Sequence, residues 1–137
     1  MSESSVHMHY VNQLLLFAKK LIPEDKHSFI FVDQPDSFQK PPRTNLNFIP
    51  DLYYRLNDFL VIGEAKTYGD VDTKHSRSQY EDYYNDALGF EGKAIMIFSV
   101  PLAAKGTIKN IMRRITGTKN GKVTIYFVSD LGIVETI

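Results

Sequence analysis

Apolar residues recur along the chain at two different spacings, and these spacings set out the predicted elements. Near the amino terminus they are three and four residues apart, which predicts an amphipathic helix that Pro23 ends. Its apolar face comprises Tyr10, Val11, Leu14, Leu15, Ala18, Leu21 and Ile22. Apolar runs then predict strands at 27–32, 48–56 and 59–66. Residues 33–45 are rich in turn-forming residues, and we expect a mobile loop there.

The second half of the chain alternates helices with strands. Residues 80–88 carry apolar side chains at helical spacing, and so do residues 108–115. Continuous apolar runs predict buried strands at 93–100 and 122–128. The order is therefore helix, three strands, helix, strand, helix, strand. It predicts an α/β fold with a mixed sheet, built as one domain over residues 1–137.

Several residues are typical of helix ends. Gly89 is a predicted carboxyl-terminal cap. Thr107 is a predicted amino-terminal cap, and Gly117 follows the end of the same helix. Ser76 and Gln79 have the spacing of a capping box, in which the glutamine side chain satisfies a free amide at the helix start.

Composition narrows the class of protein. The 137 residues are 43% apolar and 23% charged, as in a globular domain. There is no cysteine, which excludes disulfides, thiolate metal sites and cysteine nucleophiles. The apolar stretch 14–18 is too short to span a membrane and lacks the preceding basic residues of a signal peptide. We therefore expect a cytoplasmic protein without a membrane partner.

Charge is unevenly distributed along a chain whose net charge is zero. Residues 1–92 hold nine Lys or Arg against fourteen Asp or Glu, whereas residues 93–137 hold seven against two. Lys109, Arg113 and Arg114 lie off the apolar face of their predicted helix, with no acid between them. We expect these three to contact a phosphate backbone. A solvated helix face has the same pattern and is the alternative.

Two acids and a lysine stand where the predicted strands should be apolar. If Asn57 and Asp58 form a two-residue turn, Asp51 lies directly opposite Glu64. Directly opposed residues share a face of the sheet, and Lys66 projects from the same face because it follows Glu64 by two positions. The sequence thus predicts three charged side chains at one end of a hairpin.

Such a pair of carboxylates favours a divalent cation. Opposed acids repel each other, and burial raises the cost of ionising them. Mg²⁺ binds one or two carboxylates together with waters and phosphate oxygens, and we expect Mn²⁺ to substitute for it. The cation can activate a water, which Lys66 could orient or deprotonate. The alternative is that Asp51, Glu64 and Lys66 are solvated groups where the strand leaves the core.

The motif itself resembles a known family. "PD" at 50–51, thirteen residues before "EAK" at 64–66, resembles the PD-(D/E)xK phosphodiesterase superfamily. That family has a restriction-endonuclease-like fold with an αβββαβ core. The predicted elements fit this core from Tyr10 to Val128, with an extra carboxyl-terminal helix and strand.

The resemblance implies roles for particular residues. Asp51, Glu64 and the backbone carbonyl of Ala65 would be metal ligands, and Lys66 the catalytic lysine. Gln79 would lie beside them, because the sequence is similar to the VRR-Nuc branch, where a glutamine begins the helix after the ExK strand.

At other positions the sequence departs from the pattern of the superfamily. Many members of the superfamily add a glutamate from the first helix, and this helix offers His9, Asn12 and Gln13 instead, which favours a site with one metal. We interpret His7 and His9 as surface residues. Tyr83 resembles the tyrosine of the QxxxY element of related exonucleases, although its spacing also suits packing.

Together these features predict a Mg²⁺-dependent nuclease acting on double-stranded or branched DNA, as an endonuclease or a structure-directed enzyme. Arg43, Lys74 and Arg77 flank the predicted site in sequence and are further candidates for phosphate contacts. Two alternatives stay open: a catalytically idle nuclease-fold domain that binds nucleic acid or serves assembly, and an unrelated α/β binding protein. The sequence also leaves open whether the substrate is DNA or RNA and whether the protein forms a homodimer.

Overall fold

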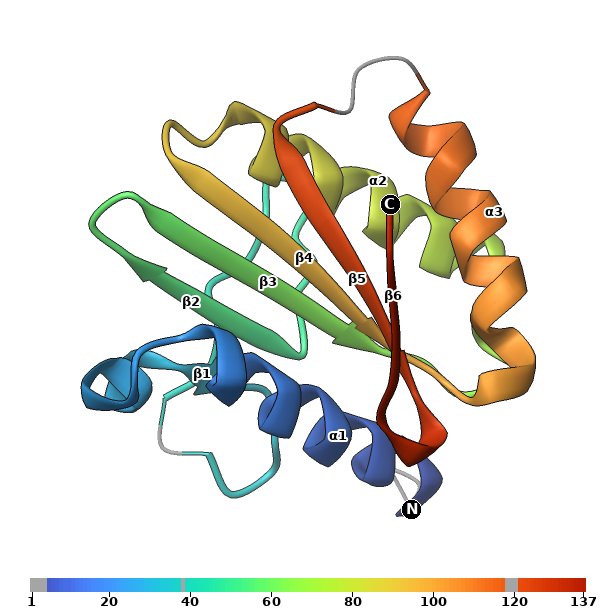
Figure 1. Ribbon diagram of the computed structural model, residues 1–137, viewed down its shortest axis with the longest axis horizontal. Helices are drawn as coiled ribbons and strands as arrows, with labels where there is room; N and C mark the ends of the chain where they lie inside the picture. Colours follow the sequence, from blue (N-terminus) through green and yellow to red (C-terminus); the bar gives the residue numbers. More distant parts are fainter. Residues whose placement is uncertain (1–4, 38, 118–120) are drawn as a thin grey trace.

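The computed structural model describes residues 5–37, 39–117 and 121–137, and places helices on both faces of a six-stranded mixed sheet (Figure 1). The strands lie in sequence order; β3, β4 and β5 are parallel neighbours, and the remaining pairs are antiparallel. The elements are α1 Ser5–Leu21, β1 Phe31–Val32, β2 Leu52–Leu56, β3 Phe59–Ala65, α2 Lys74–Gly89, β4 Lys93–Ser99, α3 Lys105–Thr116, β5 Val123–Ser129 and β6 Ile133–Thr136.

This arrangement confirms the predicted α/β class, the mixed sheet and the order of the elements up to β5. The strand β6 was not predicted; it follows a turn over residues 130–132 and pairs with β5. No helix in the described part of the chain combines the length and apolar character that crossing a membrane requires.

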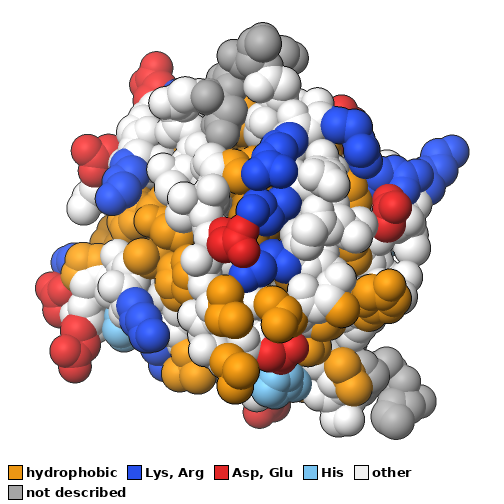
Figure 2. Space-filling view, turned by 45° about the vertical axis from the view of Figure 1, so that its right-hand side comes forward, with side chains coloured by type: hydrophobic (Ala, Val, Ile, Leu, Met, Phe, Trp, Pro, Cys, Tyr) orange, Lys and Arg blue, Asp and Glu red, His pale blue; other side chains and the backbone are white. Residues whose placement is uncertain are grey.

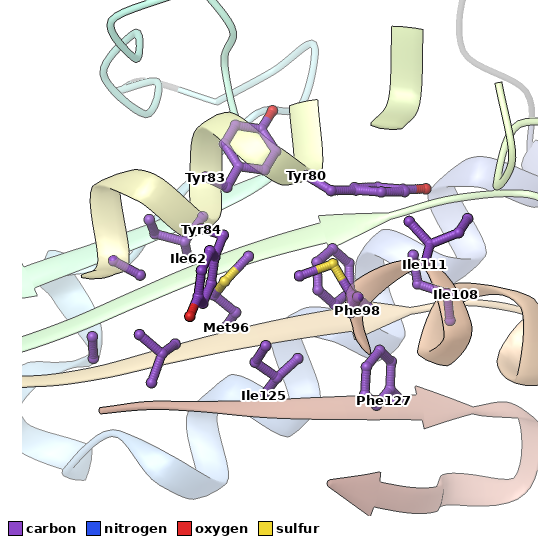
Figure 3. Packing of buried hydrophobic residues seen from close by; sticks show 14 of the residues in the cluster. Ile62, Tyr80, Tyr83, Tyr84, Met96, Phe98, Ile108, Ile111, Ile125 and Phe127 are labelled. Carbon is purple, nitrogen blue, oxygen red and sulfur yellow. The ribbon is translucent and has the colours of Figure 1, made fainter. Parts of the chain in front are cut away.

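Each face of the sheet has its own apolar core. Residues of α1, among them Val11 and Leu14, pack against Val61 and Ile95 on one face. The helices α2 and α3 cover the other face, where strand side chains meet helix side chains (Figure 3). The residues labelled there are Ile62, Tyr80, Tyr83, Tyr84, Met96, Phe98, Ile108, Ile111, Ile125 and Phe127. The central strands are therefore buried on both sides.

Close packing of α1 on the sheet requires a glycine. A Cβ atom at Gly63 would lie 2.7 Å from Leu14 Cδ1, which is nearer than real Cβ contacts allow. The absence of a side chain at this point of β3 leaves room for the Leu14 side chain of α1.

The hairpin of β2 and β3 has the predicted register. Leu56 pairs with Phe59 and Leu52 with Gly63, so the turn consists of two residues. Asn57 adopts the left-handed conformation, with φ of 56°, which asparagine tolerates better than most residues. The turn thus fixes which residues face each other at the far end of the hairpin.

Two predicted strands are shorter than expected. Residues 24–29 form a 3-10 helix in place of the start of the strand predicted at 27–32, leaving only Phe31–Val32 as β1. The His27 ring lies 2.8 Å from the carbonyl oxygen of Ile22, a contact that holds this turn against the end of α1. The strand predicted from Phe48 begins only at Leu52, because Pro50 has no amide hydrogen to donate to a neighbouring strand.

Three predictions about helix ends are wrong. Gly89 is the last residue of α2 and has no left-handed conformation. Thr73 caps α2 by accepting a hydrogen bond from the amide of Ser76 at 3.0 Å, so Ser76 and Gln79 form no capping box. Thr107 lies inside α3, which begins two residues earlier.

Gly117, by contrast, follows α3 with φ of 53°, as predicted. The predicted loop 33–45 contains no helix or strand in its described residues, 33–37 and 39–45. Its mobility stays a prediction.

Candidate functional site

The four residues predicted to carry catalysis lie together at one end of the sheet. Asp51 precedes β2, Glu64 stands near the end of β3, Lys66 follows it, and Gln79 belongs to the second turn of α2. Their exposed fractions are 7%, 4%, 9% and 9%, respectively. Charged groups are rarely buried to this degree without a partner or a function.

Backbone amides of the opposite strand hold both acids. The amide of Asp51 donates a hydrogen bond to Glu64 Oε1 at 3.2 Å, and the amide of Ala65 donates to Asp51 Oδ2 at 2.8 Å. These two bonds link the strands of the hairpin beyond the last paired residues of β2. Each carboxylate therefore has one oxygen anchored by a backbone amide, and the second oxygen of Glu64 faces Lys66.

Lys66 is held between an acid and an amide. Its Nζ donates to Gln79 Oε1 at 2.5 Å and lies 3.4 Å from Glu64 Oε2. The same nitrogen lies 6.0 Å from the centre of the Tyr80 ring. Because α2 begins directly after the loop that follows β3, its second turn reaches the lysine with a neutral acceptor. Gln79 thus orients the ammonium group without neutralising it.

The site has less positive charge than its acids require. Burial and, to a lesser extent, the neighbouring Asp51 raise the pKa of Glu64 to about 8, although Lys66 and the Asp51 amide oppose this shift. Burial also raises the pKa of the Tyr83 hydroxyl, with Glu64 and Asp51 adding to the effect. The one lysine therefore does not fully compensate two buried carboxyl groups.

His7 belongs to the site, and the expectation that it is a surface residue is wrong. Its Nε2 lies 3.2 Å from the carbonyl oxygen of Ala65 and 3.5 Å from Asp51 Oδ2, and its side chain is partly buried. The sequence held a signal for this position, since His7 precedes Val11 and Leu14 by four and seven residues on the buried face of α1. His9, expected at the surface, is 63% exposed and lies 3.6 Å from Asp130.

The predicted basic residues do not form one surface. Lys109 bonds to Glu135 of β6, and Lys105 Nζ lies 2.9 Å from the same carboxylate. No acid lies among these basic residues in sequence, but the inference that Lys109 has no acidic partner is wrong. Its partner is distant in sequence and comes from the strand that was not predicted. Figure 2, which brings the side with α3 forward, shows a row of basic side chains with an acidic one among them.

The other basic residues separate into two places. Arg114 lines a hollow of about 330 Å³ together with Lys74 and Arg77. Arg43 lines a different hollow of about 600 Å³, which also includes Pro50 next to the acid pair. Arg113 is exposed, and its Nη1 lies 3.4 Å from Asn110 Oδ1. The structure thus brings Lys74 and Arg77 of α2 together with Arg114 of α3 around one hollow, and Lys109 does not line it.

The chain matches no family model, no curated protein and no solved structure. The resemblance to the PD-(D/E)xK superfamily therefore rests on the residues and on the order of elements.

The oxygen atoms of the site can be compared with the ligands that a divalent cation requires. Among the described residues, no group of three or more His, Asp or Glu side chains forms a metal cage. Mg²⁺ does not need one, because it takes one or two carboxylates and completes its shell with waters and substrate oxygens. Asp51, Glu64 and the Ala65 carbonyl supply such oxygens, and the repulsion between buried acids favours a cation. The donor set fits Mg²⁺ or Mn²⁺.

Proposed function

We propose that this protein is a metal-dependent nuclease that hydrolyses phosphodiester bonds in nucleic acid. One observation carries the proposal: two buried carboxylates face each other across a hairpin end, and a buried lysine stands beside them. Structural ion pairs gain little from burial, because taking charges out of water is costly. A second acid adds to that cost, which a bound cation would offset.

Each residue has a part in this chemistry. When bound, a divalent cation supplies an activated water and offsets the charge that develops on the phosphoryl oxygens. Asp51 and Glu64 would hold the cation, with the Ala65 carbonyl as a further oxygen ligand. The hydrogen bonds from the Asp51 and Ala65 amides keep both carboxylates in place before the cation arrives. Little reorganisation is then needed on binding.

Lys66 acts on the reacting groups rather than on the cation. Gln79 Oε1 accepts a hydrogen bond from Lys66 Nζ at 2.5 Å and so holds the ammonium group beside the end of β3. A positive charge there can orient the attacking water or neutralise the pentacovalent phosphorus. His7 Nε2 reaches the Ala65 carbonyl and Asp51 from the opposite side of the site, and so positions two proposed ligands.

The experiment is a cleavage panel. Duplex, single-stranded, flap and junction DNA are incubated with the protein in Mg²⁺, in Mn²⁺ and in excess chelator, with Lys66→Ala as the control. We expect cleavage of at least one substrate that requires the cation and is lost in the variant. Binding without cleavage in either metal would instead identify a catalytically idle nucleic-acid-binding module. Cleavage in excess chelator would contradict the proposal.

A further inference from the structure

Three basic side chains from two helices line one hollow. Lys74 and Arg77 come from the first turn of α2, and Arg114 comes from the last turn of α3. The hollow measures about 330 Å³, and all three side chains are exposed. Glu81 is its one acidic lining residue. The hollow lies between helices on the face of the sheet that carries the acid pair.

Two of these cations lack a compensating charge. Within the described residues, neither the Lys74 nor the Arg114 side chain forms an ion pair or a hydrogen bond, while Arg77 pairs with Asp72 at 2.5 Å. On the opposite side of α3, Lys105 and Lys109 share Glu135. Unpaired like charges around one hollow repel each other, and an anionic ligand removes that repulsion. Arg114 thus contributes uncompensated positive charge from α3 to the hollow.

The hollow and the acid pair flank the same helix. With 3.6 residues per turn, Arg77 lies about 160° around α2 from Gln79, and Lys74 about 140°. Gln79 faces the site through Lys66. The two places therefore lie on different sides of α2, and an α-helix with its side chains is about 10–12 Å across.

This separation fits the two strands of duplex DNA. The major groove of B-DNA is about 12 Å wide and admits an α-helix, with one phosphate backbone on each side. The deep and narrow major groove of A-form RNA does not admit one. A single strand would occupy only one side of the helix.

We propose that the hollow between α2 and α3 binds the phosphates of the second strand of duplex DNA. The amino-terminal turns of α2 then lie in the major groove, and the strand to be cut lies at Asp51 and Glu64. This inference rests on the proposed function, and it specifies the substrate as double-stranded DNA.

The test compares two double variants with equal loss of charge. Lys74→Gln with Arg114→Gln removes both unpaired cations of the hollow. Lys19→Gln with Lys20→Gln removes two exposed lysines at the end of α1 and serves as the control. Affinity for a short DNA duplex, for its single strand and for the same sequence as duplex RNA is measured at several salt concentrations, without divalent cation so that no strand is cut.

We expect only the hollow variant to change duplex DNA binding. Its slope of log affinity against log salt should become shallower by up to about 1.8, since each lost phosphate contact contributes about 0.9. An unchanged slope overturns the proposal, and so does an equal change in the control. An equal effect on the single strand overturns the assignment to a second strand, and an equal effect on duplex RNA overturns the choice of DNA.

A small phosphodiester separates this inference from the proposed function. Bis(4-nitrophenyl) phosphate is too small to reach from the acid pair to the hollow, so its hydrolysis in Mn²⁺ reports on the catalytic site alone. The hollow variant should hydrolyse it at the wild-type rate while cleaving duplex DNA more slowly at low concentration. If wild-type protein cleaves neither substrate but the salt slopes differ as expected, the proposed function fails and the DNA-binding hollow stands.

Discussion

Replacing Glu64 with glutamine should make the metal-free protein less sensitive to rising pH. The substitution keeps the size of the side chain and its acceptor for the Asp51 amide, and removes only the ability to ionise. Burial, with Asp51 nearby, raises the pKa of Glu64 from 4.5 to about 8 in the folded protein. In the unfolded chain the group is expected to ionise near its ordinary pKa.

The sign and size of the effect follow from proton linkage. Between pH 4.5 and about 8 the folded protein keeps a proton that the unfolded chain has lost. Unfolding therefore releases a proton in this range, and the free energy of unfolding falls as pH rises. A full proton changes it by about 1.4 kcal/mol per pH unit. Between pH 6 and pH 9, Glu64 should thus remove about 2–3 kcal/mol of stability.

Urea denaturation of both proteins at pH 6 and pH 9, in the presence of a chelator, measures this quantity. Other titrating groups are common to both proteins, so the difference between their two pH effects isolates Glu64. We expect the wild type to lose about 2–3 kcal/mol more than Glu64→Gln. Parallel losses in the two proteins would refute the picture of a buried acid that ionises at a cost.

Three further substitutions test separate parts of the structure. Lys66→Met should abolish cleavage while leaving Mn²⁺ binding by calorimetry intact, because this lysine supplies no ligand oxygen; normal cleavage by this variant would remove it from the chemistry. Gly63→Ala should lower the free energy of unfolding by about 1–3 kcal/mol in urea, since the new Cβ would meet Leu14, and unchanged stability would contradict the close packing of α1. Tyr80→Phe should lower the free energy of unfolding by about 1–3 kcal/mol in the same assay, because the buried Val71 carbonyl loses the hydroxyl that donates to it at 2.8 Å. An unchanged stability would mean that this carbonyl finds another donor.

Local patterns of the sequence were sufficient for much of the site. The two-residue turn at Asn57 and Asp58 sets the hairpin register, and the register places Asp51 against Glu64. Turn length and the alternation of side chains depend on a few neighbouring residues, so both can be predicted from the sequence. The order of helices and strands follows for the same reason, since each element carries its own apolar period.

Contacts between segments that are far apart in the sequence could not be predicted from local patterns. The pairing of Lys109 with Glu135 depends on β6 lying beside β5 and near α3, which no local pattern encodes. His7 reaches Ala65 only because α1 packs over the end of β3, where Gly63 leaves room. The meeting of Lys74 with Arg114 likewise requires α2 and α3 to lie on one face of the sheet. In each case packing of whole elements, rather than propensity, decides the neighbours.

The central claim is that the buried acid pair binds a cation. Calorimetric titration of the protein with Mn²⁺ at pH 8, without nucleic acid, tests it most directly. The wild type is compared with Glu64→Gln and with Glu81→Gln, which removes an acid from the exposed side of α2 as a matched control. We predict a saturable binding event in the wild type and in Glu81→Gln that is lost in Glu64→Gln. Equal binding in all three proteins, or no binding in the wild type, would contradict the assignment of Asp51 and Glu64 as metal ligands.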